Sequence, residues 1–209
     1  MVEATPAVSE YDGPYTLPLP GELPLPNERK FDNGFKEKPA RKKATLDVKF
    51  GNLTNKNYEQ MRILNYLTLP VIYSEDFYDR LKVYQRYSKF AYVKDVLVGA
   101  ISCKEDIRED GSHVCYIMTI TVLEAYRRYG IASALLKQAM KDCNEARNVS
   151  EMTLHVQASN KAALEFYKKH GFEITEELPN YYKELEDKDC MVLLKKIDLK
   201  ALAAEGDKQ

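Results

Sequence analysis

The most informative stretch of this sequence lies between a long apolar run and a helical pattern, and it reads Tyr126-Arg127-Arg128-Tyr129-Gly130-Ile131-Ala132-Ser133. It places a basic pair before small residues, at a point where a helix is expected to begin. The backbone N–H groups and positive end of such a helix suit a pyrophosphate group. A basic turn before a helix is equally common as an ordinary connection, so the surrounding residues must separate the two interpretations.

The sequence around this stretch alternates between strand and helix patterns. Residues 114–123 form the longest run of β-branched and apolar side chains, which is typical of a central strand covered on both faces. From Gly130 the apolar residues repeat at helical spacing, at Ile131, Leu135, Ala139 and Cys143. Further strands are expected at residues 46–50, 90–93, 96–103, 152–156, 172–175 and 190–197. Further helices are expected from an N-cap at Thr54 to residue 67, from residue 74, and at 161–170. This alternation predicts the α/β class, with one mixed central β-sheet flanked by helices.

The first 45 residues differ in composition from the rest of the chain. They hold seven of the nine prolines and show no sustained apolar period, so they do not bury enough surface to offset the entropy of ordering. Residues 17–26 favour polyproline II, either as a ligand of SH3 or WW domains or as a stiff spacer. We therefore expect a disordered Pro-rich extension over 1–45, one folded domain over 46–199 and a flexible tail over 200–209.

Charge and cysteine spacing exclude several kinds of partner. Lys and Arg number 31 and Asp and Glu number 32, so a net charge of −1 gives no field that would draw the chain to nucleic acid or a membrane surface. The four cysteines lie far apart, at 103, 115, 143 and 190, which fits neither zinc ligands nor a disulfide framework, and no metal is expected. Without a recognisable signal peptide or a run of about 20 apolar residues, the chain is expected in the cytoplasm or the nucleus.

Two patterns together resemble the GNAT superfamily of N-acetyltransferases. The spacing Arg-x-x-Gly-x-Ala, at Arg127 to Ala132, resembles the acetyl-CoA loop of that superfamily. An Asn-led helix that begins after Asn160 and closes on Tyr167 and Gly171 resembles its second signature. The resemblance implies the GNAT acyl-CoA N-acyltransferase fold, with acetyl-CoA as cosubstrate. By this resemblance the residues expected to bind acetyl-CoA are Ile120, Thr121, Val122, Arg127, Arg128, Tyr129, Gly130, Ile131, Ala132, Ser133, Asn160, Ala163 and Tyr167.

A closer resemblance, over residues 48–194, is to the NatE-type or San-like N-terminal acetyltransferases. It rests on four segments of this sequence: 69–73 (Leu-Pro-Val-Ile-Tyr), 116–119 (Tyr-Ile-Met-Thr), 154–157 (Leu-His-Val-Gln) and 180–183 (Asn-Tyr-Tyr-Lys). The implied reaction moves an acetyl group from acetyl-CoA to the α-amine of a protein, typically Met followed by a hydrophobic residue. The implied partners are the N-terminal peptide, the catalytic and auxiliary subunits of NatA, and the ribosome.

The residue types suit this chemistry. An α-amine has a pKa near 7.7 to 8.0, so a general base is useful before it attacks a thioester. Alternate residues of a strand share a face, so Tyr116 and Met118 form one set and Thr153, His155 and Gln157 another. If the two strands are neighbours, Tyr116 and His155 can meet. The resemblance implies that they act as the general base through an ordered water, whereas a lone histidine in an apolar strand is otherwise more often a core residue.

The resemblance also implies a catalytic acid and a peptide site. Tyr167 lies where relatives place the tyrosine that protonates the leaving thiolate, although an aromatic packing residue explains the same position. Leu69 stands where the family commonly has Phe, which affects the preferred second residue of the substrate. The residues expected to contact the peptide are Leu69, Pro70, Val71, Tyr73, Met118, Tyr181 and Tyr182.

Two alternatives keep the fold and change the function. The acceptor could be a lysine side chain or a small polyamine, although segments 69–73 and 180–183 hold no acidic cluster to attract one. The chain could instead be a weakly active, acetyl-CoA-binding scaffold subunit of a ribosome-associated NatA complex.

Overall fold

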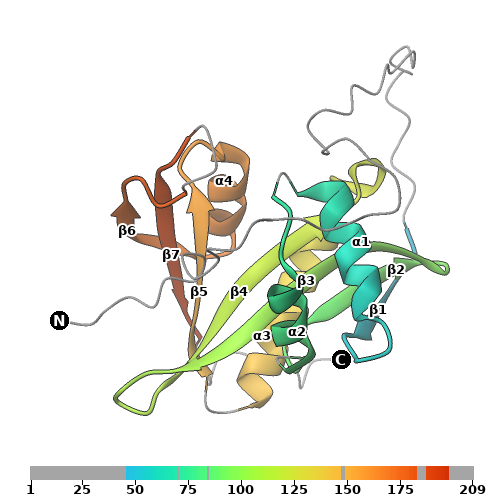
Figure 1. Ribbon diagram of the computed structural model, residues 1–209, viewed down its shortest axis with the longest axis horizontal. Helices are drawn as coiled ribbons and strands as arrows, with labels where there is room; N and C mark the ends of the chain where they lie inside the picture. Colours follow the sequence, from blue (N-terminus) through green and yellow to red (C-terminus); the bar gives the residue numbers. More distant parts are fainter. Residues whose placement is uncertain (1–45, 70, 84, 147–148, 183–186, 198–209) are drawn as a thin grey trace.

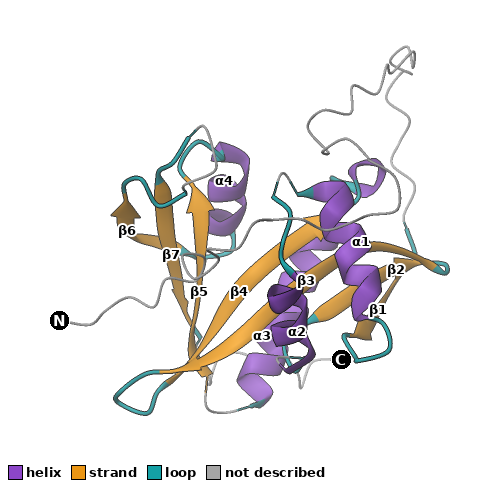
Figure 2. Ribbon diagram, viewed as in Figure 1, coloured by secondary structure: helices purple, strands orange, loops and turns teal. Residues whose placement is uncertain are grey.

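The computed structural model describes residues 46–69, 71–83, 85–146, 149–182 and 187–197. Seven strands form one mixed sheet in the order β1-β2-β3-β4-β5-β7-β6, with helices on both of its faces (Figures 1 and 2). The expected extension over 1–45, the tail over 200–209 and Pro70 lie outside the described residues, so the division into domains stays a prediction. The strands are β1 (Val48–Asn52), β2 (Lys89–Val93), β3 (Val96–Ile107), β4 (His113–Val122), β5 (Val149–Gln157), β6 (Glu173–Leu178) and β7 (Cys190–Lys196), and the helices are α1 (Tyr58–Thr68), α2 (Glu75–Val83), α3 (Ile131–Glu145) and α4 (Lys161–Lys169).

Most elements follow the sequence patterns, but several element ends differ: β3 and β6 end later than expected, at Ile107 and Leu178, and β5 begins earlier, at Val149. The expected N-cap at Thr54 is wrong, because α1 begins only at Tyr58 and has Asn57 at its N-cap position. The Asn57 side chain instead accepts a hydrogen bond from the Thr54 N–H (2.7 Å), which holds residues 54–57 in a turn ahead of the helix. The first strand runs two residues later than expected, since Gly51 and Asn52 continue the antiparallel pairing with β2.

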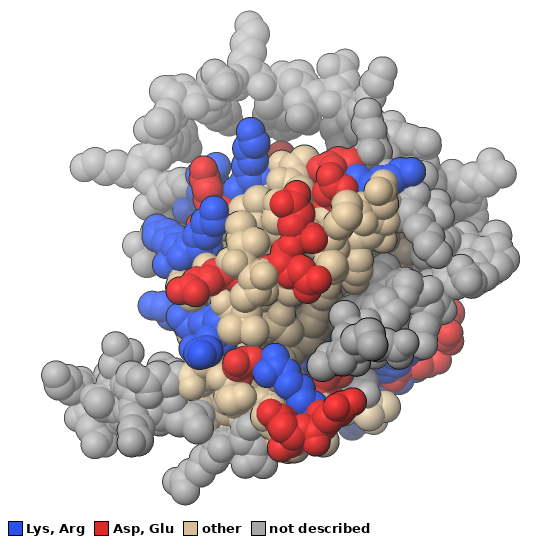
Figure 3. All heavy atoms as spheres, turned by 90° about the vertical axis from the view of Figure 1, so that its left-hand side faces the viewer, with Lys and Arg blue, Asp and Glu red and all other residues tan. Residues whose placement is uncertain are grey.

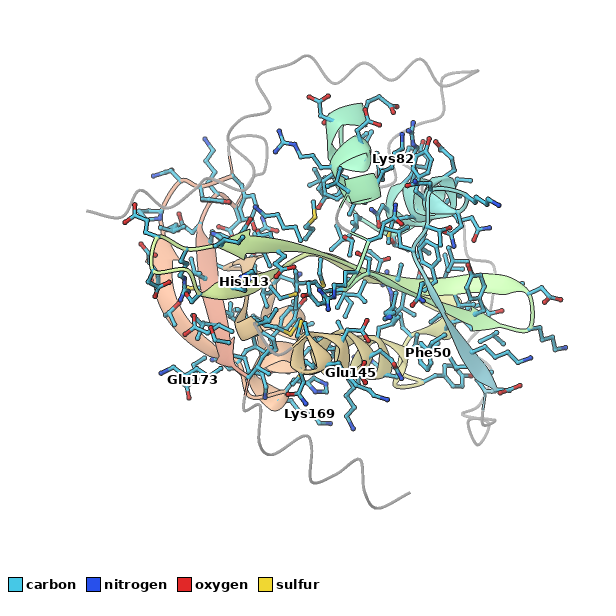
Figure 4. All side chains as sticks on the ribbon, turned by 90° about the horizontal axis from the view of Figure 1, so that it is seen from below. Phe50, Lys82, His113, Glu145, Lys169 and Glu173 are labelled. Atoms are coloured by element: carbon cyan, nitrogen blue, oxygen red, sulfur yellow. The ribbon has the colours of Figure 1, made fainter. Side chains whose placement is uncertain are left out.

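The helices divide the protein into two apolar layers, one on each face of the sheet. α3 covers one face with Ile131, Leu135, Leu136, Ala139 and Cys143, which pack on β3, β4 and β5 together with Tyr167 of α4. α1 and α2 cover the other face with a cluster that includes Met61, Leu64, Phe77 and Leu81. In Figure 4 the labelled Lys82 of α2 and Glu145 of α3 lie on opposite sides of the sheet. β4 lies in the middle of the strand order, so the expectation of a central strand is confirmed.

The two strands that carry the candidate catalytic residues run side by side and then part. β4 and β5 pair in parallel from His113↔Val149 to Tyr116↔Thr153, and the pairing ends there although both strands continue. Just beyond this point Met118 is left out of the pairing between β4 and β3. Its neighbours Ile117 and Thr119 pair with Cys103 and Ser102, which are adjacent on β3. Beyond Tyr116 the carboxyl ends of β4 and β5 diverge (Figure 1). This leaves the edge of β4 that faces β5 without a strand partner over its last residues.

Candidate active site

Tyr116 and His155 meet at the point where β4 and β5 part. Tyr116 is the last residue of β4 in the parallel ladder, and His155 lies two residues beyond its partner Thr153 on β5. The Tyr116 hydroxyl oxygen lies 3.0 Å from Nδ1 of His155, which is hydrogen-bond distance, and their ring centroids are 5.5 Å apart. The condition set by the sequence, that the two strands be neighbours, is therefore met.

Burial sets the protonation state of this pair. It lowers the pKa of His155 to about 4, with the Lys104 ammonium as the second cause. Burial also raises the pKa of Tyr116 well above its ordinary value, and the neighbouring hydroxyls of Tyr181, Tyr182 and Tyr73 act in the same direction. At neutral pH the imidazole is thus uncharged and the phenol keeps its proton. A neutral imidazole held in this way can accept a proton from an incoming group.

The segment between β6 and β7 supplies an aromatic wall beside His155. The ring of Tyr181 stacks on His155 with centroids 5.0 Å apart and an interplanar angle of 16°, and Tyr182 meets Tyr181 edge-on. Hydrogen bonds tie this segment to the end of β5, because the Gln157 side chain donates to the Asp187 carbonyl (2.7 Å) and the Ala158 N–H donates to the Asp189 carbonyl (2.8 Å). The wall is therefore anchored to the strand that carries His155.

The segment between α1 and α2 approaches the same pair from another side. The ring of Tyr73 stacks on Phe77 of α2 with centroids 4.1 Å apart, and its hydroxyl contributes to the raised pKa of Tyr116. Met118 packs against the same α1–α2 cluster as Tyr73. Leu69 ends α1, and Leu69 and Val71 are half-buried, whereas Pro70 lies outside the described residues. Apolar and aromatic side chains from two distant parts of the sequence thus gather around Tyr116.

The start of α3 has the form expected for an anion site. Gly130 has a φ of 80° and Arg128 a φ of 67°, so the chain turns sharply through the left-handed region before the helix begins. The Arg127 Nε–H donates to the Val122 carbonyl (3.1 Å), which ties the turn to the end of β4. The backbone N–H groups of the first helical turn lie here with the positive end of the helix dipole. The Ser133 hydroxyl on this turn lies 2.9 Å from Nε2 of His170.

Three other residues expected to bind the cosubstrate are Thr121 on β4 and Asn160 and Ala163 at the start of α4. The side chain of Thr121 is buried, and its hydroxyl has no hydrogen-bond partner among the described residues. Thr121 lies on β4 beyond the last pairing with β5, and its partner on β3 is Ala100 of the α1–α2 cluster, so the hydroxyl is enclosed on that face of the sheet. Asn160 caps α4, because its side-chain oxygen accepts the Ala163 N–H (3.1 Å). The Ala163 N–H is therefore occupied by this helix cap.

Tyr167 does not join the Tyr116–His155 pair. It is buried in the core layer of α3, where its ring meets Phe166 and Phe172 edge-on. Burial raises the pKa of its hydroxyl, so the phenol is protonated at neutral pH and keeps a proton to donate. The packing interpretation from the sequence accounts for these contacts, and a role toward the thiolate stays a prediction.

Sequence reasoning missed one residue at this site, Lys104 of β3. It pairs directly with Tyr116 in the β3–β4 ladder, and its Nζ lies 5.2 Å from the centroid of the Tyr116 ring. The hairpin offered a signal for it. Because Ile107 pairs with His113 across the turn that joins β3 and β4, moving three residues away from the turn along each strand places Lys104 opposite Tyr116.

Charge elsewhere on the molecule is mixed. Figure 3 shows basic and acidic side chains interspersed on the face of the molecule nearest β6, so this face does not carry a single sign of charge. In the part of the chain that the structure describes, no cluster of three or more His, Cys, Asp or Glu side chains could hold a metal ion. Over the same residues, no helix has the length and apolarity needed to cross a membrane.

Comparison with known proteins places this architecture in a family. The chain matches the Acetyltransferase (GNAT) family over residues 57–172. It is 36% identical over 162 residues to N-alpha-acetyltransferase 50 of Danio rerio, which covers 78% of this chain and 96% of the relative. It is 38% identical over 148 residues to the probable N-acetyltransferase san of Drosophila melanogaster, in a match that covers 71% of this chain and 80% of the relative.

A solved structure agrees with these relatives. Arabidopsis thaliana Naa50, in complex with the bisubstrate analogue CoA-Ac-MVNAL, superposes with a TM-score of 0.67 at 41% identity, over 72% of this chain and 99% of that chain. The GNAT fold and the San-like resemblance expected from the sequence are confirmed by these comparisons, as is the expected class of enzyme, an N-α-acetyltransferase. The chain belongs to the acetyltransferase (GNAT) family.

Proposed function

We propose that this protein transfers the acetyl group of acetyl-CoA to the α-amine of proteins that begin with Met followed by a hydrophobic residue. The observation that carries the proposal is the neutral Tyr116–His155 pair, walled by Tyr181, at the point where β4 and β5 part. The bisubstrate analogue bound by the Arabidopsis relative supports it, because that analogue joins CoA to a peptide beginning Met-Val.

The residues present fit acetyl-CoA. The sharp turn at Arg128 and Gly130 and the first turn of α3 suit its pyrophosphate. The partnerless edge of β4 beyond Tyr116 suits the amide groups of the pantetheine arm. When bound, acetyl-CoA supplies the acetyl group as a thioester.

The chain's own residues prepare the amine. The nitrogen of the neutral α-amine forms a bond to the thioester carbonyl carbon, and as it does so His155 takes a proton from that nitrogen, through a water or directly, while the hydrogen bond to Tyr116 fixes the orientation of the imidazole ring. The carbon–sulfur bond then breaks, and the thiolate leaves with the electron pair. Tyr167 donates a proton to the thiolate, His155 releases its proton to solvent, and solvent returns a proton to Tyr167. The net change is one acetylated amine and one free thiol for each acetyl-CoA consumed.

The aromatic walls set the preference for the peptide. Tyr181 and Tyr182 on one side and Tyr73 on the other offer flat apolar surface with hydroxyls that can bond a peptide backbone. We assign the first Met side chain to this surface, with Leu69, Val71 and Met118 beside it. The smaller Leu69 in place of the family's Phe favours a bulkier second residue.

The partners and location proposed here rest on resemblance. We propose that the enzyme acts in the cytoplasm or nucleus, beside the catalytic and auxiliary subunits of NatA at the ribosome. The resemblance of segments 69–73, 116–119, 154–157 and 180–183 to the NatE-type acetyltransferases is the ground for this proposal. Co-purification of the full chain with NatA subunits, reversed by a surface variant that leaves acetylation intact, tests it.

A peptide panel tests the proposed activity. Purified protein is assayed with peptides that begin Met-Leu, Met-Val, Met-Lys and Ser-Glu, each at subsaturating concentration, and kcat/KM is compared. We expect Met-Leu and Met-Val to exceed Met-Lys and Ser-Glu by at least tenfold. Equal rates for all four peptides would reject the substrate preference. Binding of acetyl-CoA with no acetylation of any peptide would favour the scaffold alternative instead.

A further inference from the structure

Lys104 places a positive charge beside the Tyr116–His155 pair. Its Nζ lies 5.2 Å from the Tyr116 ring centroid, while the Tyr116 hydroxyl lies 3.0 Å from His155. The side chain of Lys104 is only 20% exposed, and it forms an ion pair at 3.0 Å with Asp106, whose side chain is 47% exposed. The Lys104 ammonium is therefore the more buried member of this ion pair, and the Asp106 carboxylate is the more exposed one.

The other groups that face the pair carry no charge at neutral pH. They come from three parts of the chain: Tyr73 from the segment before α2, Tyr181 and Tyr182 from the segment before β7, and Cys190 from β7 itself. Among the causes that shift the pKa of His155, Lys104 is the charged group. Lys104 therefore contributes a positive field at the imidazole, which the neighbouring Asp106 carboxylate reduces in part, although the protein as a whole has a net charge of −1.

We propose that Lys104 determines specificity by charge: its ammonium keeps the acceptor site free of other cations, so that the site takes the neutral amine and favours an α-amine over a lysine side chain. This inference rests on the proposed acetylation of α-amines at His155. Lys104 acts through the field at the site and does not exchange a proton with the substrate.

The two kinds of amine differ enough for this to matter. With pKa values near 7.7 to 8.0 for an α-amine and 10.4 for lysine, roughly a third of the former and about one in a thousand of the latter is neutral at pH 7.5. A site with a carboxylate would bind both ammonium ions and lose this difference. A site with a fixed cation preserves it, because an ammonium ion brought next to Lys104 is repelled.

The first test follows His155 directly and needs no catalysis. The chain has three histidines, so the imidazole signals can be assigned with single variants and titrated by NMR. In Lys104→Met the pKa of His155 should rise by roughly 0.5 to 1 unit, the size expected when a partly screened unit charge is removed. Lys104→Arg keeps the charge and should leave the pKa unchanged. Lys104→Gln repeats the test if the Met variant does not fold.

A matched control separates the field of Lys104 from general loss of a lysine. Lys89 of β2 is likewise largely buried, with 13% side-chain exposure, and it pairs with Asp142 of α3. Lys89→Met should leave the His155 titration unchanged. An unchanged pKa of His155 in Lys104→Met, or an equal rise in Lys89→Met, overturns the inference.

The second test measures selectivity. A peptide with a free Met-Leu start and the same peptide with a blocked start and an internal lysine are compared by kcat/KM from pH 6 to 9. The ratio of kcat/KM for the peptide with the free start to kcat/KM for the blocked peptide should fall at least fivefold in Lys104→Met. It should stay unchanged in Lys104→Arg. A constant ratio with a raised pKa of His155 overturns the claim of specificity. Absence of acetylation in the unaltered protein would reject the proposed function, while the NMR result would still decide whether Lys104 controls the charge at His155.

Discussion

Replacement of Tyr116 by Phe removes one hydroxyl group from the centre of the site. The residue is 8% exposed, and its hydroxyl oxygen lies 3.0 Å from Nδ1 of His155. The variant keeps the ring and its packing but leaves the imidazole without the partner that orients it. A positioned general base contributes about 10²- to 10⁴-fold to a rate. We expect kcat to fall about 10²- to 10³-fold, which corresponds to roughly 2.7 to 4 kcal/mol of barrier.

The same change has a bounded effect on stability and on cosubstrate binding. Leaving a buried polar group without its partner costs about 1 to 3 kcal/mol, which lowers the melting temperature by roughly 2 to 12 °C in a domain of this size. Acetyl-CoA affinity should change less than about threefold, because the phosphate contacts proposed for residues 127–133 lie at the other end of β4. The loss should therefore appear in turnover and not in binding.

The assay pairs steady-state kinetics on a Met-Leu peptide with calorimetric titration of acetyl-CoA. Tyr92→Phe is the matched control, since the Tyr92 hydroxyl also makes a 3.0 Å hydrogen bond, to Gln60, on an exposed part of the sheet. Its kcat should stay within twofold of the unaltered protein. A Tyr116→Phe variant that folds, binds acetyl-CoA and keeps more than a third of its turnover would refute the role given to the pair.

Three further predictions concern other parts of the site and fold. Tyr181→Leu removes the ring stacked on His155 and should raise KM for the peptide about tenfold with little change in acetyl-CoA affinity, measured by the same kinetics and calorimetry. Gly171→Ala places a side chain at a φ of 80° and should lower the free energy of unfolding by about 1 kcal/mol in urea denaturation, while acetylation kinetics stay unchanged. Because the folded pKa of His155 is lowered to about 4 and an unfolded histidine titrates near 6.5, stability should decrease as pH falls from about 6.5 to about 4, and His155→Gln should flatten that decrease in acid titrations followed by circular dichroism.

Local patterns were enough to predict the elements that hold the site. The change from strand period to helix period after Gly130 located α3, and the β-branched run at 114–123 located β4. Alternation along β5 correctly grouped His155 with Thr153 and apart from the buried Met152 and Leu154. These predictions succeed because each depends on side chains only a few residues apart.

The remaining features depend on how strands meet, which one sequence does not state. The end of the β4–β5 pairing after Tyr116 and the interruption at Met118 arise from register between distant segments. The N-cap at Thr54 was mispredicted because a turn held by the Asn57 side chain competes with the helix start. Lys104 was overlooked because a lysine in a strand usually marks a solvent-facing position, and only its partner across the hairpin gives it a place in the site.

The most direct test of the account is the position of the acetyl group on a product. A peptide that begins Met-Leu and contains one internal lysine is incubated with the purified protein and acetyl-CoA, and tandem mass spectrometry locates the added acetyl group. We expect a single acetyl group on the α-amine, no modification of the lysine, and no reaction when the peptide start is blocked. Acetylation of the lysine in the blocked peptide, at a rate comparable with that of the free α-amine, would contradict it.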